Sequence, residues 1–195
     1  VHLIDNSLLY QKQTDEQSDV KENEVLHVPS GVNKLNFSYM SHIKLIEWPQ
    51  KCTVSDLGDE GFFSFYNLIE ITIPKLVKVI PNSLFNHCNY LRKVQFEKGS
   101  KLKEIGNFAF AYTSIDQIDL PKSVQTIGDS SFYNCLNLKE IIFEGKMIGE
   151  EAFAYSGLTS FTLSNRTKSI GSRAFQYCKS LKTFKFTKAR KLNLS

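Results

Sequence analysis

The four cysteines and four histidines are the side chains best suited to chemistry in this sequence, because thiolate and imidazole groups act as nucleophiles and as metal ligands. No Cys-x-x-Cys pair occurs, and the histidines, at positions 2, 27, 42 and 87, include no helix-spaced pair. No Ser/His/Asp or Cys/His arrangement and no glycine-rich phosphate loop can be assembled. We therefore expect no enzyme, no metal site and no cofactor.

The composition excludes several other classes of protein. The chain has 195 residues, of which 42% are hydrophobic and 23% charged, as in ordinary globular proteins. No apolar run approaches the roughly 18 residues of a membrane-spanning helix, so membrane insertion of this chain is not expected. The net charge is +4, but 24 basic and 20 acidic residues are interspersed and form no one-sided patch, which argues against nucleic acid as a partner. Three Asn-x-Ser/Thr sequences, beginning at Asn36, Asn165 and Asn193, permit glycosylation without indicating it.

A repeat of 21 to 25 residues organises the chain. An apolar anchor is followed by phenylalanine five positions later in all six copies, and by glycine one position later in five of them. The anchors and their phenylalanines are Leu57 and Phe62, Ile80 and Phe85, Ile105 and Phe110, Ile127 and Phe132, Ile148 and Phe153, and Ile170 and Phe175. A fixed period of this length indicates a stack of similar coils.

Each copy continues with a second apolar block spaced L-x-x-I-x-I, as in Leu138, Ile141 and Phe143. Alternate apolar residues predict a short strand with one buried face, and such a strand must stack on its neighbours in a parallel ladder. The small residue before each phenylalanine favours a tight helical turn. The glycine after the anchor favours a sharp bend or a close approach of two chain segments.

The segment from Ile115 to Cys135, I-D-Q-I-D-L-P-K-S-V-Q-T-I-G-D-S-S-F-Y-N-C, resembles the BspA-like leucine-rich repeat family, whose consensus is approximately L-x-x-I-x-I-P-x-x-V-x-x-I-G-x-x-A-F-x-x-C. The resemblance covers residues 57–186 well and 25–56 loosely. It implies a surface-exposed or secreted protein of an anaerobic bacterium or parasitic protist, which attaches to host cells, matrix proteins or other microbes. Leu3 to Tyr10 also resembles a hairpin often inserted in this family.

We expect one domain, a repeat solenoid of about eight coils: a right-handed leucine-rich repeat superhelix with short parallel β-strands and helical turns. Residues 1–24 would form a hairpin-like segment and polar loop, 25–56 degenerate capping repeats, 57–186 six regular repeats and 187–195 a tail. Since no polar capping repeat follows residue 186, the chain is interpreted as a fragment of a longer array from which signal or anchor segments have been removed.

The repeat also constrains the cysteines. Cys88, Cys135 and Cys178 each lie eight residues after an anchor, two coils apart. Coils spaced by about 4.8 Å would place them about 10 Å from one another, beyond the roughly 4.4 to 6.8 Å Cα separation of a disulfide. We predict buried structural thiols. Cys52, outside the regular repeats, could be exposed and could pair with a partner molecule.

Binding is the activity that a solenoid serves best, through the outward side chains of its strands on a broad concave face. Two outward rows are predicted there: Glu70, Lys93, Gln117, Glu140, Ser160 and Thr183, and Thr72, Gln95, Asp119, Ile142, Thr162 and Lys185. They could equally be plain solvated surface. An alternative is a tyrosine stripe seven residues after the anchors, Tyr112, Tyr155 and Tyr177, joined loosely by Tyr90 and Tyr133.

The expected function is therefore a non-enzymatic adhesion or protein-binding module at a cell surface, with a protein ligand. The alternative is a structural or intracellular scaffold whose coils serve assembly, without a host ligand. The ligand and the oligomeric state are not specified by the sequence.

Overall fold

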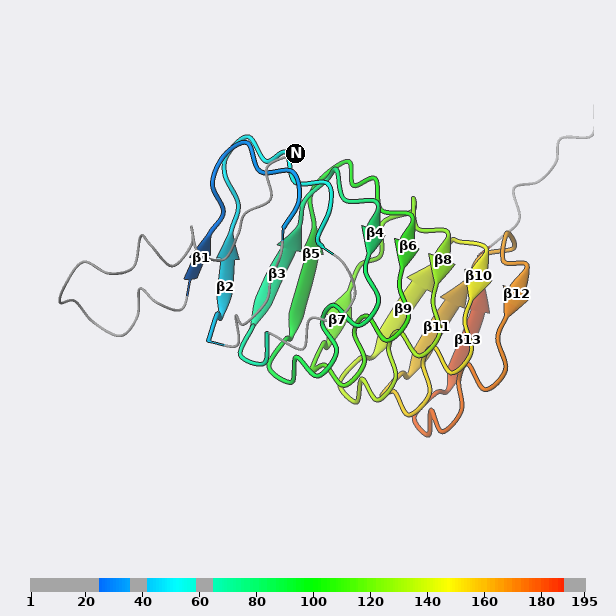
Figure 1. Cartoon of the computed structure of the whole chain (residues 1–195). Helices are drawn as coiled ribbons and strands as arrows, with labels where there is room; N and C mark the ends of the chain where they lie inside the picture. Colours follow the sequence, from blue (N-terminus) through cyan, green and yellow to red (C-terminus); the bar gives the residue numbers. More distant parts are fainter. Residues whose placement is uncertain (1–24, 36–41, 59–64, 188–195) are drawn as a thin grey trace, which may run out of the picture.

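The computed structural model describes residues 25–35, 42–58 and 65–187. These residues form a parallel β-solenoid of about seven turns, fewer than the eight coils expected. Figure 1 shows the strands stacked along one axis, with β1 at one end and β12 and β13 at the other. The predicted hairpin at residues 1–24 and nearly all of the predicted tail lie outside the described residues.

One side of the solenoid, the long-strand face, carries eight strands, which are separated along the chain by about seven turns. These strands are β1 (Val25–His27), β2 (Leu45–Glu47), β3 (Glu70–Ile73), β5 (Lys93–Phe96), β7 (Gln117–Ile118), β9 (Glu140–Phe143), β11 (Ser160–Leu163) and β13 (Thr183–Phe186). All pairings are parallel, as the L-x-x-I-x-I blocks predict, but they form three separate sheets: β1-β2, β3-β5-β7 and β9-β11-β13. The long-strand face is therefore interrupted twice.

A second side carries the anchors on short strands and is continuous. The strands β4 (Val79–Ile80), β6 (Glu104–Ile105), β8 (Thr126–Ile127), β10 (Met147–Ile148) and β12 (Ser169–Ile170) pair in one five-stranded parallel sheet. Its register places each anchor isoleucine beside the next, from Ile80 to Ile170. The repeat period of the sequence thus brings equivalent anchor residues side by side in this sheet.

The core lies between the two sides and contains a stack of phenylalanine rings. The rings of Phe85, Phe110, Phe132 and Phe153 follow one another at centroid distances of 5.3 Å, and Phe175 follows at 5.5 Å, all nearly parallel. Phe85 to Phe153 are completely buried. Phe62, the first phenylalanine of the series, lies outside the described residues.

The turn segments that carry these phenylalanines are not helical, which corrects the prediction. Non-glycine residues three and seven positions after each anchor have left-handed backbone, with φ between 52° and 61°: Ser83, His87, Phe108, Tyr112, Ser130, Asn134, Glu151, Tyr155, Arg173 and Tyr177. A right-handed helix cannot continue through them. No helix is assigned anywhere in the described ranges.

This alternating backbone sends every second amide to the next turn of the solenoid. The N–H groups of Ser83, Phe85 and His87 donate to the carbonyls of Asn107, Ala109 and Ala111 at 2.8 to 2.9 Å, and the later turns repeat the pattern. The amides between them close local turns with the carbonyl three residues back. Left-handed backbone costs roughly 1 kcal/mol per residue, and these inter-turn hydrogen bonds offset that cost.

The glycines after the anchors are required by close approach. A Cβ on Gly149 would lie 2.5 Å from the backbone N of Asp129, and a Cβ on Gly171 would lie 2.4 Å from that of Glu150. Neither glycine has positive φ, so close approach is the reason at these positions, whereas Gly58, after the anchor Leu57, has a φ of 96° and fits the predicted bend.

Candidate protein-binding surfaces

The two outward rows predicted from the sequence lie on the long-strand face. None of their twelve residues is buried, whereas the residues between them, such as Ile71, Ile141 and Phe161, are buried on every strand except β13, where Phe184 is exposed. Within each sheet the register aligns the first row: Glu70 lies beside Lys93 and Lys93 beside Gln117, and Ser160 lies between Glu140 and Thr183. The second row is aligned in the same way except at Asp119, which does not pair with Gln95, and both rows change sheet between β7 and β9.

An open hollow of about 700 Å³ lies at this change of sheet. Residues from both sides line it: Asp116, Gln117, Ile118, Asp119, Leu120 and Lys122 from the turn that carries β7, and Lys139, Glu140, Ile142 and Glu144 from the turn that carries β9. Four of the twelve predicted residues, Gln117, Asp119, Glu140 and Ile142, thus meet around one concavity. No residue pattern indicates the hollow, because it depends on which strands pair.

The predicted tyrosine stripe is a ladder of rings that contact one another at tilts of 30° to 54° along the turn segments. Tyr112, Tyr133, Tyr155 and Tyr177 follow at centroid distances of 5.5, 5.3 and 4.7 Å, and His87 stacks on Tyr112 at 4.3 Å. His87 was missed as a member, although it holds the same position after its anchor as Tyr112. Tyr90 is exposed and has no ring contact among the described residues.

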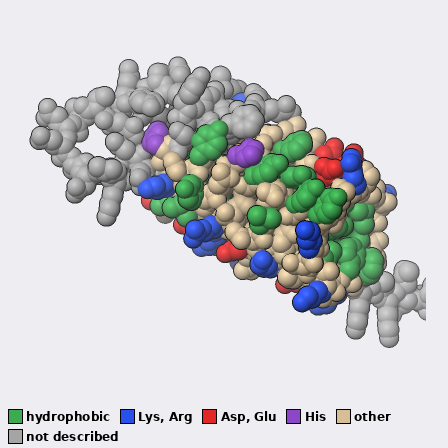
Figure 2. Space-filling view, turned by 90° about the horizontal axis from the view of Figure 1, so that it is seen from below, with side chains coloured by type: hydrophobic (Ala, Val, Ile, Leu, Met, Phe, Trp, Pro, Cys, Tyr) green, Lys and Arg blue, Asp and Glu red, His purple; other side chains and the backbone are tan. Residues whose placement is uncertain are grey.

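Figure 2 shows the solenoid from below, relative to the view in Figure 1. Hydrophobic side chains run along this side, and Lys and Arg side chains lie at one margin. The tilted tyrosine rings pack against one another between turns, while Tyr155 and Tyr177 remain 40% and 52% exposed. Desolvation first, and then the neighbouring Tyr112 and Tyr155, raise the pKa of Tyr133. We take the long-strand face as the binding candidate, because its strands hold polar side chains in aligned rows.

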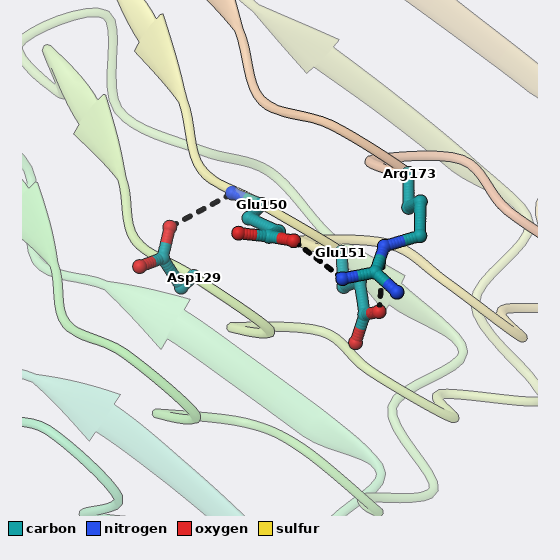
Figure 3. A network of polar contacts seen from close by, with 4 residues as sticks. All are labelled: Asp129, Glu150, Glu151 and Arg173. Atoms are coloured by element: carbon teal, nitrogen blue, oxygen red, sulfur yellow. Dashed lines mark hydrogen bonds and ion pairs between the residues drawn. The ribbon is translucent and has the colours of Figure 1, made fainter.

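A polar ladder follows the anchors two positions later and is structural. Oδ1 of Asn82 accepts the N–H of Asn107 at 2.7 Å, Oδ1 of Asn107 accepts that of Asp129 at 2.8 Å, and Oδ1 of Asp129 accepts that of Glu150 at 2.8 Å. Arg173 ends the ladder by donating to Glu150 and pairing with Glu151 (Figure 3). These bonds lower the pKa of Glu150 and raise that of Arg173, with the contact between the two as the first cause.

The cysteines are unpaired and suit a structural role. Cys88 and Cys135 are buried, and Cys178 and Cys52 are partly buried. Burial raises the pKa of Cys88 to about 12 and that of Cys135 to about 11, so neither thiol is a reactive thiolate near neutral pH.

No group of three or more His, Cys, Asp and Glu side chains converges on a metal position within the described residues. In the same part of the chain, no helix has the length and hydrophobicity that crossing a membrane requires. Asn165 is exposed, and Asn36 and Asn193 lie outside the described residues.

The chain matches the family model described as "BspA type Leucine rich repeat region", in six copies, over residues 24–139 and 103–193. The chain belongs to the BspA-type leucine-rich repeat family. Repeats of this kind generally serve as non-enzymatic scaffolds and commonly bind proteins. No curated protein matches the chain in sequence.

Three crystal structures illustrate the shared fold, each aligned over 83% of this chain. The T. pallidum leucine-rich repeat protein TpLRR is 22% identical, with a TM-score of 0.63 and 69% of its chain covered. The pneumococcal vaccine antigen PcpA and a leucine-rich repeat protein from Bacteroides ovatus are each 21% identical, with TM-scores of 0.56 and with 50% and 55% of their chains covered. This BspA-type chain therefore spans about half the length of PcpA, and these likenesses concern the fold alone.

Proposed function

We propose that this chain is a non-enzymatic protein-binding module of a cell-surface or secreted protein and that it attaches to a protein on host cells or in the extracellular matrix. One observation supports the proposal most: the two outward rows form an exposed surface on a rigid parallel ladder. Such a ladder positions side chains before a ligand arrives, which lowers the entropy cost of association.

The surface location rests on family membership and on the fold shared with PcpA, whose description as a vaccine antigen fits exposure to a host. The alternative is a scaffold that binds only partners of its own cell. The two functions predict different results for the isolated chain: an attachment module binds to foreign cells or matrix, and a scaffold does not.

The test is binding of the purified chain to intact epithelial cells and to a panel of immobilised matrix proteins. The variant is the double exchange Glu140→Arg with Lys185→Glu, which keeps the net charge and changes both rows of the long-strand face. The matched control is Glu104→Arg with Lys168→Glu, at exposed positions on or beside the short-strand sheet.

We expect saturable binding that the control retains and the long-strand variant loses. Binding that both variants retain would overturn the assignment to this face. Absence of binding to every cell and matrix protein would overturn attachment and favour the scaffold.

A further inference from the structure

The hollow at the β7–β9 boundary opens on one side of the solenoid only. The turns that carry β7 and β9 are joined on the short-strand side by the pairing of β6 with β8, and in the turn segments by the stacking of Phe110 on Phe132. On the long-strand face no ladder joins β7 to β9. The separation is thus a local feature of the face to which we assign binding.

Pro121 accounts for the short pairing between β5 and β7. After β5, β11 and β13, the residue that follows the strand donates its N–H to the end of the preceding strand: Glu97 to Ile73 at 3.0 Å, Ser164 to Phe143 at 2.9 Å and Thr187 to Leu163 at 2.8 Å. Proline has no N–H and cannot make this bond. Consequently β5 and β7 pair over two residues, against four for β3 and β5, and Asp119 and Leu120 remain outside the ladder (Figure 1).

Both ends of the hollow are closed by contacts between the two turns. At the start of the strands, the Lys139 amide donates to the Asp116 carbonyl at 3.4 Å. Beyond the end of the strands, Lys122 Nζ pairs with Glu144 Oε1 at 3.1 Å. Between these contacts the hollow is bounded by two turns, which are joined on their other sides by the β6–β8 pairing and by the stacking of Phe110 on Phe132. The hollow therefore does not depend on a mobile loop.

The lining of the hollow combines apolar surface with negative charge. Ile142 is 53% exposed at its rim, and Leu120 is partly exposed. The carboxylates of Asp116, Asp119 and Glu140 make no ion pair or hydrogen bond with the described residues, whereas Glu144 is engaged by Lys122. With Lys139 included, four carboxylates and two ammonium groups line the hollow, a net charge of −2.

We propose that this hollow receives an extended segment of the protein ligand in which an arginine or lysine and an apolar residue are two positions apart, so that both side chains project from the same face. The basic side chain would meet the unpaired carboxylates of Asp119 and Glu140, and the apolar one would cover Ile142 and Leu120. A volume of about 700 Å³ lies in the ordinary range of binding sites and exceeds the needs of a single side chain. The inference rests on the proposed function and specifies the chemistry of its partner.

The test uses NMR titration of the whole chain with two short synthetic peptides. In one, arginine and valine alternate at every second position with serine between them; in the other, glutamate replaces arginine. The variants are Asp119→Lys and Glu140→Lys, and the control is Glu104→Lys, an exposed carboxylate on the short-strand sheet with the same change in charge.

We expect the arginine peptide to shift the amide signals of Ile118, Asp119 and Ile142, and the glutamate peptide to shift none of them. Each hollow variant should weaken binding of the arginine peptide about tenfold relative to the control, since a like charge then faces the ligand. Equal affinity in hollow and control variants, preference for the glutamate peptide, or no binding of either peptide would overturn the inference.

The cell and matrix experiment separates this outcome from failure of the proposed function. If attachment is lost in the Glu140→Arg/Lys185→Glu variant but Asp119→Lys binds cells as the control does, the long-strand face stands and the hollow does not contribute. If no attachment occurs but the arginine peptide binds, the hollow stands and the proposed attachment fails.

Discussion

Cys135 shows how a polar atom is accommodated inside the solenoid. Its Sγ donates to the Phe110 carbonyl at 3.1 Å and lies 3.4 Å from Thr113 Oγ1. One pair of turns later, Cys178 Sγ donates to the Phe153 carbonyl at 3.0 Å and contacts Ser156 Oγ. From Cys88 to Cys178, thiols and hydroxyls alternate at this position, so the turns use a small donor here and do not need thiol reactivity.

Because the Cys135 thiol is buried, we expect the free energy of unfolding to decline at alkaline pH. Burial raises its pKa from 9.0 to about 11, so above pH 9.0 the unfolded chain loses a proton that the folded chain retains. The contribution of the Cys135 thiol to the free energy of unfolding is complete below pH 9.0 and is lost as the pH rises toward 11. Urea unfolding across this range should show a shallower decline for Cys135→Ser, whose hydroxyl does not titrate. Parallel curves for the variant and the parent would contradict the assignment.

The period of the sequence was sufficient to identify buried residues but not backbone conformations. Anchors, phenylalanines and strand residues such as Ile105, Phe110 and Ile118 are buried as predicted. The left-handed backbone at Phe108 and Tyr112 was not foreseen, because glycine, the residue that normally signals it, is absent there. The conformation is instead imposed by inter-turn hydrogen bonds, which appear only when the turns are stacked.

The stack of phenylalanine rings is the element that joins successive turns through the core. Phe132 lies between Phe110 and Phe153 at 5.3 Å from each. Phe132→Ala should therefore lower the free energy of unfolding by about 3 to 5 kcal/mol, because the rigid neighbours cannot collapse into the cavity. Phe186→Ala is the control: its side chain is 68% exposed, and about 1 kcal/mol or less is expected. Equal losses in chemical denaturation would mean that the stack does not carry the core.

Strand pairing was only partly predictable at the scale of elements. The apolar blocks predicted parallel strands in register, and the sheets confirm this for β3 with β5 and for β9 with β11. The interruption between β7 and β9 could not be predicted, because the apolar blocks of both copies look regular in the sequence. The I-x-I-P cadence at Pro121 belongs to the repeat consensus, and its missing N–H shortens the pairing of β7 with β5.

At the scale of the whole molecule, each turn contacts only its neighbours, so stability is expected to vary along the stack. In the described residues, the inner anchor Ile127 is fully buried, while Ile170 is 45% exposed. Likewise Phe161 of β11 is fully buried, while Phe184 of β13 is 40% exposed. The strand hydrogen bonds do not show this difference, since β13 pairs with β11 over four residues as β11 does with β9.

Amide hydrogen exchange measured by mass spectrometry distinguishes these two influences on stability. If burial governs local opening, peptides that contain β13 and β12 should exchange much faster than those that contain β8 and β9, despite equivalent ladders. Phe132→Ala should then accelerate exchange in β8 and β9 and leave the already rapid exchange of β13 nearly unchanged. Uniform protection from β3 to β13 would instead show that the solenoid opens as a single cooperative unit, and that the gradient of burial has no energetic consequence.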